Sequence, residues 1–151
     1  MPRILRFWVI CGVFAFQMIG CTQTPVLAKS GIIAESLAVR ALIGEAGGQK
    51  DDELLAHAYA LKNRGTLKGV YGLHSKHAKH PSAKVWQRAC KAWREANLYP
   101  KLNMIGERTE WRSEYDLAKM AKRHLKWADQ GLFDPLKVGK TTFFRLRKRG
   151  T

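Results

Sequence analysis

The sequence is short of acidic residues. Its 151 residues include 27 Lys and Arg but only 12 Asp and Glu, so the formal net charge at pH 7 is +15. An excess of this size indicates an anionic partner or working surface, and both a cell wall and nucleic acid meet that condition. The chain lacks a zinc-finger spacing, a glycine-rich phosphate loop and an aromatic-basic strand motif. These absences argue against specific nucleic-acid recognition.

Cysteine is also scarce. Of the three cysteines, Cys11 and Cys21 lie in the N-terminal segment, and only Cys90 remains in the body of the chain. The body therefore cannot form an internal disulfide. It contains no internal repeat and no low-complexity linker, and its length suits one domain with a modest core, residues 29–151, which ends in a basic tail.

Residues 1–28 are expected to form a leader. Two arginines precede an apolar stretch of about 15 residues, which is short for a membrane-spanning helix and suits a signal sequence. Two processing sites compete, a lipobox in which Cys21 becomes the lipidated N-terminus and a cleavage after Ala28; an uncleaved anchor is the third alternative. We expect an exported protein of the periplasm or cell envelope; lipidation or an uncleaved leader would attach it to the membrane, and cleavage after Ala28 would not. Because the leader contains two of the positive charges and no acid, its removal lowers the formal net charge from +15 to +13.

The candidate site lies in residues 41–72. Apolar residues recur at helical spacing over residues 33–45, and Gly47-Gly48 can take the positive φ values that end a helix. Asp51 and Asp52 can cap a second helix that continues to Asn63. Glu45 therefore falls in the last turn of an apolar helix, at a corner of the chain.

That position favours the protonated form of Glu45. The C-terminal end of the helix dipole is negative, and the preceding apolar residues supply no counter-charge. A protonated glutamic acid that a substrate can reach is what general-acid cleavage of a glycosidic bond requires. The alternative is a solvated residue that pairs with Lys50 or Arg40.

The remaining chain is expected to be mostly helical. Residues 66–81 should form a loop with a short hairpin; its three histidines, His74, His77 and His80, alternate with lysines that repel a cation, so no metal and no cofactor is expected. A helix from Ser82 should bury Trp86, Cys90 and Trp93. A capping box at residues 113–116 should open a last long helix that ends at Gly131, with its apolar residues inward. Those residues are Leu117, Met120, Ala121, His124, Leu125 and Ala128.

Several of these runs resemble the cell wall hydrolase family that includes the spore-cortex-lytic enzymes and many phage-derived relatives. The strongest are A-L-I-G-E-A-G-G, an A-x-A-x-x-x-K-N-R helix and G-V-Y-G, all within residues 41–72. Weaker matches are the tryptophan helix, the run from Gly106 to Trp111 and the closing V-G-K-T-T-F-F. In the last two, Glu110 and Thr141 stand where the family usually has histidine.

This resemblance implies a small, mainly α (α+β) lysozyme-like domain in which a hairpin or loop subdomain lines the cleft. It implies that Glu45 is the catalytic residue of peptidoglycan cleavage. It also implies that substrate is bound by five further residues: Asn63, Tyr71, Thr109, Glu110 and Trp111. The expected partners are peptidoglycan glycan strands and an anionic wall surface, with no specific nucleic acid.

Two chemistries remain open for this family. A lytic transglycosylase needs Glu45 alone, whereas an inverting hydrolase needs a second carboxylate about 6.5–9.5 Å away. The candidates for the second carboxylate are Glu107, Glu110, Asp51 and Asp52. An E-S pair at Glu35-Ser36 marks the catalytic glutamate in other lytic transglycosylases, but a capping or surface role fits its place at a helix start. A non-catalytic wall-binding protein and a basic nucleic-acid-binding protein are the alternatives from other classes.

Overall fold

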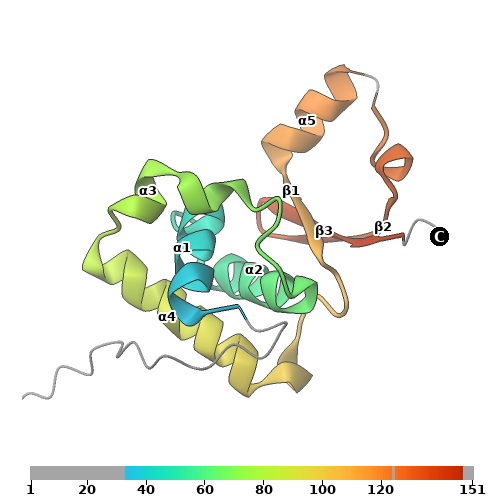
Figure 1. Cartoon of the computed structure of the whole chain (residues 1–151). Coiled ribbons are helices and arrows are strands. Elements are labelled where there is room, and N and C mark those ends of the chain that lie inside the picture. The colour runs from blue at the N-terminus through green and yellow to red at the C-terminus, as the bar shows by residue number, and fades with distance from the viewer. Residues whose placement is uncertain (1–32, 124, 148–151) are drawn as a thin grey trace, which may run out of the picture.

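The structure, a computed structural model, describes residues 33–123 and 125–147. It is an α+β fold, with a group of helices followed by a small antiparallel sheet (Figure 1). The predicted leader, with Cys21, lies outside the described residues. Within the described residues, no helix combines the length and the apolar character needed to cross a membrane.

Three helices form most of the core: α1 (Glu35–Ala46), α2 (Asp51–Arg64) and α4 (Ala83–Leu98). Their facing sides are rich in alanine, which favours helix formation and, being small, lets helix axes approach closely. Nine of these alanines are buried: Ala38, Ala41, Ala46, Ala56, Ala58, Ala60, Ala89, Ala92 and Ala96.

Larger side chains close the core around these alanines. Trp93 and Cys90 are buried on α4, and Trp86 packs against the same cluster, which confirms the core role predicted for all three. Tyr59 is buried on α2, and its hydroxyl donates to the carbonyl of Tyr99 at 2.8 Å. Lys62 donates to the carbonyl of Ala96 at 2.9 Å and so satisfies a free carbonyl at the end of α4.

Arg88 fixes the turn between α1 and α2. From α4 its guanidinium donates to Asp51 Oδ1 at 2.7 Å and to the carbonyl of Gln49 at 2.6 Å. The predicted positive φ at this turn is wrong. Gly47 has φ −60° and donates to the carbonyl of Ile43, and Gly48 is not among the positive-φ residues. Gly47 is needed instead because an added Cβ would lie 2.6 Å from that carbonyl oxygen.

The segment after α2 is helical, so the predicted hairpin is wrong. It contains the 3-10 helix η1 (Tyr71–His74) and the short helix α3 (Lys76–Lys79), and it crosses α1. Gly65 ends α2 with φ 67°, and Ser75 caps α3 by accepting from Ala78 N–H at 3.1 Å. Glycines in this segment supply turns between helices rather than between strands.

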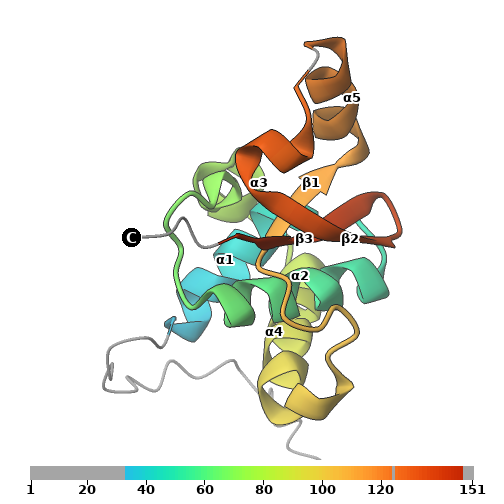
Figure 2. The same cartoon turned by 90° about the vertical axis from the view of Figure 1, so that its right-hand side faces the viewer.

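The sheet comes from the last third of the chain. β1 (Glu110–Ser113), β2 (Leu132–Val138) and β3 (Thr141–Leu146) pair antiparallel in the order β1-β3-β2. β2 bulges between Phe133 and Leu136, where Asp134 has φ 53° and precedes Pro135. The sheet lies over α2 (Figure 2), with the Phe143 ring against the His57 ring at 5.0 Å between centroids.

Glu53 anchors the sheet to α2. Its buried carboxylate accepts from the backbone N–H of Lys140, in the turn between β2 and β3. The adjacent Gly139 has φ 57°, and any Cβ there would collide with the Glu53 carboxylate. The turn therefore requires glycine both for its positive φ and for the space that Glu53 takes up. The buried carboxylate of Glu53 is satisfied by a backbone donor.

The last predicted helix is partly wrong. Its capping box is confirmed, since Ser113 accepts from Asp116 N–H at 3.1 Å and Asp116 accepts from Ser113 N–H at 3.3 Å. The helix α5 (Glu114–Lys122), however, ends well before Gly131, and a separate 3-10 helix, η3 (Trp127–Gln130), follows. No residue of α5 is buried, so the apolar face that was expected to turn inward has no core to cover.

Candidate active site

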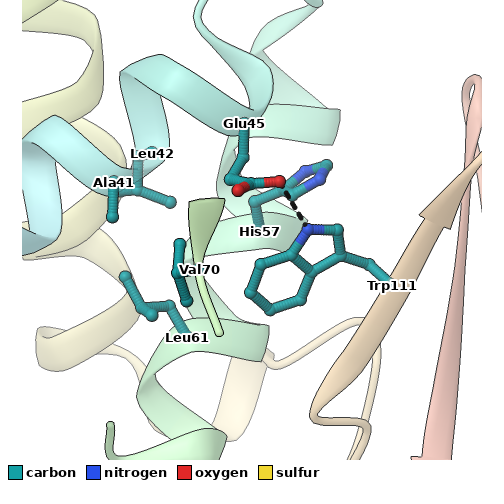
Figure 3. A pocket seen from close by; sticks show the side chains of 7 residues that line it. All are labelled: Ala41, Leu42, Glu45, His57, Leu61, Val70 and Trp111. Atoms are coloured by element: carbon teal, nitrogen blue, oxygen red, sulfur yellow. Dashed lines mark hydrogen bonds between the residues drawn. The ribbon is translucent and has the colours of Figure 1, made fainter. Parts of the chain in front are cut away.

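Glu45 sits in the last turn of α1 with both carboxylate oxygens engaged. Oε1 accepts from the backbone N–H of Gly72 at 2.7 Å, and Oε2 accepts from the indole N–H of Trp111 at 3.0 Å. The two donors belong to η1 and β1, so three separate elements meet at this carboxylate (Figure 3). Within the described residues, none of the ion pairs includes Glu45, so the pairing with Lys50 or Arg40 that was the alternative does not occur there.

Two glycines make the first of these contacts possible. Any Cβ on Gly44 would collide with the carbonyl group of Gly72, and a Cβ on Gly72 would lie 2.6 Å from Gly44 C and 2.8 Å from Glu45 Oε1. The backbone of η1 therefore rests directly on the backbone of α1. This close approach delivers the Gly72 N–H to the carboxylate, and only residues without a Cβ permit it.

The carboxylate closes one end of a small pocket. Its walls are mostly apolar, from α1, α2 and the segment before η1, with the Trp111 ring opposite (Figure 3). The interior is closed to a molecule as large as water, so a sugar would reach Glu45 from outside. The lining residues are Ala41, Leu42, Glu45, His57, Leu61, Val70 and Trp111.

His57 is the site residue that the sequence interpretation missed. It is buried beside Trp111, with ring centroids 5.6 Å apart in an edge-on arrangement. Its Nδ1 lies 2.8 Å from the carbonyl oxygen of Glu53; because a carbonyl can only accept, this contact assigns the proton to Nδ1. The available signal was position: His57 is three residues after Leu54 and four before Leu61, on the buried face of α2.

Burial lowers the pKa of His57 below its ordinary value of 6.5. The hydrogen bond to Glu53 and the charges of Glu45 and Glu53 oppose this effect but are smaller. His57 is therefore a neutral imidazole at neutral pH, and it adds no positive charge to the pocket beside Glu45.

This shift predicts acid sensitivity of the fold. In the unfolded chain His57 binds a proton near pH 6.5, whereas in the folded chain it does so only at lower pH. The unfolded state therefore binds more protons below pH 6.5, and the free energy of unfolding should fall by up to about 1.4 kcal/mol per pH unit there. Urea unfolding of the wild type and of His57→Gln between about pH 7 and 5.5 gives the free energy of unfolding at each pH. The difference between the two slopes against pH is the contribution of His57.

The matched control is His80→Gln, which changes an exposed histidine in the same way. It should keep the wild-type slope. Equal slopes for the wild type and His57→Gln would show that His57 is not held neutral by the fold.

The other predicted site residues divide into two groups. Tyr71 precedes the Gly72 donor and is 84% exposed, which leaves its ring open to a ligand beside Glu45. Glu110 lies 3.6 Å from Arg64, whose guanidinium also stands over the Trp111 ring at 5.6 Å. Trp111 is thus held between Arg64, His57 and Glu45.

In the structure, Asn63 and Thr109 make hydrogen bonds that fix the backbone of the loop before β1. The Asn63 amide donates to the carbonyls of Gly106 at 2.6 Å and Arg108 at 3.0 Å, which positions the loop that leads into β1. Thr109 donates its backbone N–H to the carbonyl of Phe144 at 3.1 Å. Their predicted contact with substrate stays a prediction, because no ligand is present.

The four acids proposed as a second carboxylate all have partners. Asp51 pairs with Arg88 at 2.7 Å and Glu107 with Arg145 at 3.7 Å, in addition to the pair of Glu110 with Arg64. Asp52 accepts from the backbone N–H of Glu53 at 2.9 Å. Glu35 pairs with Arg94 at 2.9 Å near the start of α1, as expected for a surface residue. Within the part of the chain described here, no group of three or more His, Cys, Asp or Glu residues is arranged to hold a metal ion.

Comparison of the chain with protein-family models, curated proteins and solved structures found no match. The resemblance to cell wall hydrolases therefore rests on the motif residues themselves. Three of the quoted motifs meet at one point: Gly44 and Glu45 from the first, Gly72 from G-V-Y-G, and Trp111 from the run that begins at Gly106.

Proposed function

We propose that this protein cleaves the β-1,4 bond between N-acetylmuramic acid and N-acetylglucosamine in peptidoglycan, with Glu45 as the catalytic acid. The observation that carries the proposal is the fixed carboxylate of Glu45, which N–H donors from two other elements orient at the mouth of an apolar pocket. An exposed aromatic ring, Tyr71, stands next to one donor and offers a face to a sugar. We include a lysozyme-like fold in the proposal for two reasons. The apolar helix α1, which ends next to Glu45, packs on α2, and strand β1 brings Trp111 to the Glu45 carboxylate.

The two hydrogen bonds leave room for the acid to act. Each carboxylate oxygen has two lone pairs and accepts one hydrogen bond here, so one lone pair on each oxygen is left over. Glu45 can therefore take up a proton without giving up either donor. The donors hold the group in one orientation, which reduces the entropy lost when the glycosidic oxygen arrives.

A lytic transglycosylase is the chemistry we favour. Glu45 donates a proton to O4 of N-acetylglucosamine as the C1–O4 bond breaks, and it then takes the proton of the muramyl C6 hydroxyl as O6 bonds to C1. The proton moves from O6 to O4 through Glu45, and no water is consumed. This route needs no second carboxylate, in keeping with the partners that Asp51, Glu107 and Glu110 already have.

The product end distinguishes the mechanisms. Purified peptidoglycan digested with the protein should release muropeptides that end in 1,6-anhydro-N-acetylmuramic acid, and mass spectrometry distinguishes this end from a reducing end by the mass of one water. If the products carry reducing ends instead, the protein is still a glycosidase, but water is the attacking group. A second carboxylate must then activate that water, and Glu110 is the first candidate. Binding to the wall without any release would favour the non-catalytic wall-binding protein instead.

A further inference from the structure

Residues 114–131 form an arm that stands away from the helical core. The described part of the arm consists of α5, residues 123 and 125–126, and η3, and it projects from the sheet in both views (Figures 1 and 2). The arm meets the rest of the fold at the sheet: α5 contacts β1, and η3 contacts β2. Packing against the core therefore does not explain the composition of α5.

The arm exposes apolar side chains beside a hollow. Leu125 is 47% exposed and Trp127 38%, and they line an open hollow of about 490 Å³ together with Ala121 and Ala128. The Trp127 ring lies 5.7 Å from the Phe144 ring, so the sheet holds it in place while part of it faces solvent. A half-exposed tryptophan that the fold keeps at a surface is typical of an interface with an apolar medium.

The charges around this hollow are mainly positive, and Lys126 lines it. Residues 117–128, the arm tip, contain four Lys or Arg residues and no Asp or Glu. The three acids of the arm are engaged: Glu114 pairs with Lys137 at 2.8 Å, Asp116 closes the capping box of α5, and Asp129 accepts from the backbone N–H of Lys126 at 3.3 Å. The four cations are Lys119, Lys122, Arg123 and Lys126.

We infer that the arm tip docks on the surface of an anionic lipid bilayer. Exposed leucine and tryptophan follow α5, a helix with no buried residue, and lie next to lysine and arginine in the sequence. This combination matches a surface with anionic head groups above an apolar interior. A soluble anionic polymer would satisfy the four cations but would leave the apolar hollow uncovered. A second copy of the chain would cover the hollow but would bring like charges together on two chains of net charge +15.

This inference does not depend on the proposed function. It uses no residue of the Glu45 site, and it would hold for a wall-binding protein without activity. If both are right, the arm keeps the enzyme at the membrane face of the wall.

Charge reversal tests the electrostatic part. The full chain is mixed with vesicles of phosphatidylglycerol and phosphatidylcholine in equal parts, and the bound fraction is measured by co-sedimentation. Lys119→Glu with Lys122→Glu should weaken binding by about 30-fold or more, since each lysine near an anionic surface contributes about a factor of five. Every variant carries the same residues 1–28, so the contribution of the leader cancels in the ratio.

The matched control is Lys84→Glu with Lys91→Glu, two exposed lysines of α4 that give the same change in net charge. It should weaken vesicle binding by less than about threefold, because these charges lie outside the arm tip. Equal loss in both pairs would show attraction by net charge alone, and no loss in the arm pair would also overturn the proposal.

Leu125→Ser tests the apolar part. It should weaken binding to the vesicles several-fold while binding to polyphosphate stays unchanged, because polyphosphate offers charge without an apolar interior. Equal weakening for both ligands would indicate a polymer site. A dimer that sedimentation detects in the wild type and not in Leu125→Ser would indicate a second copy as the occupant. A thermal melt of each variant shows whether it is folded.

Discussion

Glutamine in place of Glu45 is expected to lower the rate of muropeptide release by roughly 10²–10⁴-fold, the usual contribution of a general acid or base. Glutamine has nearly the same size and keeps one carbonyl oxygen that can accept from the Gly72 or Trp111 N–H, but it cannot carry and transfer a proton. The fold should therefore survive while turnover is lost. Release of soluble fragments from purified peptidoglycan measures the effect, and binding to the intact wall should stay close to that of the wild type.

Glu35→Gln is the matched control, since it makes the same change at the other glutamate of α1. Glu35 pairs with Arg94 at the helix start, and its loss should leave the rate within about twofold, as for an exposed ion pair. The comparison also tests the E-S alternative. If Glu35→Gln lost activity and Glu45→Gln kept it, the catalytic assignment would move to Glu35.

Local signals in the sequence predicted α1, α2 and α4 well. The end of α1 fell one residue beyond the predicted Glu45, Ser82 caps α4, and the Ser113 capping box forms as expected. These features depend on neighbours within four residues along the chain, so the sequence contains the information needed to predict them. The core positions of Trp93 and Cys90 follow from helical periodicity in the same way.

The sheet was largely missed for a physical reason. β2 contains Asp134-Pro135, residues that ordinarily break a strand, and it tolerates them only through a bulge with φ 53° at Asp134. The hairpin was expected instead among the glycines of residues 66–81, where short helices form. Glycine marks a turn but does not say which elements it joins.

The arm shows the limit of amphipathic patterns. The spacing of Leu117, Met120 and Ala121 predicted one apolar face of a helix correctly, but periodicity does not name the partner of that face. An inward orientation was assumed because most such faces cover a core. Here the sheet packs against α2, and no residue of α5 becomes buried.

The sequence singled out Glu45 as the candidate but did not predict the groups that hold its carboxylate. Glu45 could be chosen from its place at the end of an apolar helix, whereas the Gly72 and Trp111 donors lie 27 and 66 residues away in sequence. The resemblance placed Trp111 among the substrate-binding residues, but neither Trp111 nor Gly72 was expected to donate to the carboxylate. Contacts at such separations depend on the packing of η1 and β1, which no local pattern contains.

Alanine in place of Gly44 should be strongly damaging for so small a change. The added Cβ would collide with the Gly72 carbonyl, which is backbone and cannot rotate away, so η1 must move off α1. We expect a cost of about 1–3 kcal/mol in the free energy of unfolding, the usual range for overpacking. Because the same movement takes the Gly72 N–H from Glu45, muropeptide release should fall by tenfold or more even at temperatures where the variant is fully folded.

Gly48→Ala separates this contact from the general effect of losing a glycine. It makes the same chemical change four residues later, where an added Cβ would meet nothing within 4 Å and where φ is not positive. Its stability should be unchanged or raised by about 0.4–1 kcal/mol, because alanine restricts the unfolded chain, and its activity should be kept. A Gly44→Ala variant as stable and as active as Gly48→Ala would mean that α1 and η1 are not in backbone contact. The Gly72 donor would then not be what orients Glu45, and the indole of Trp111 would have to position the carboxylate alone.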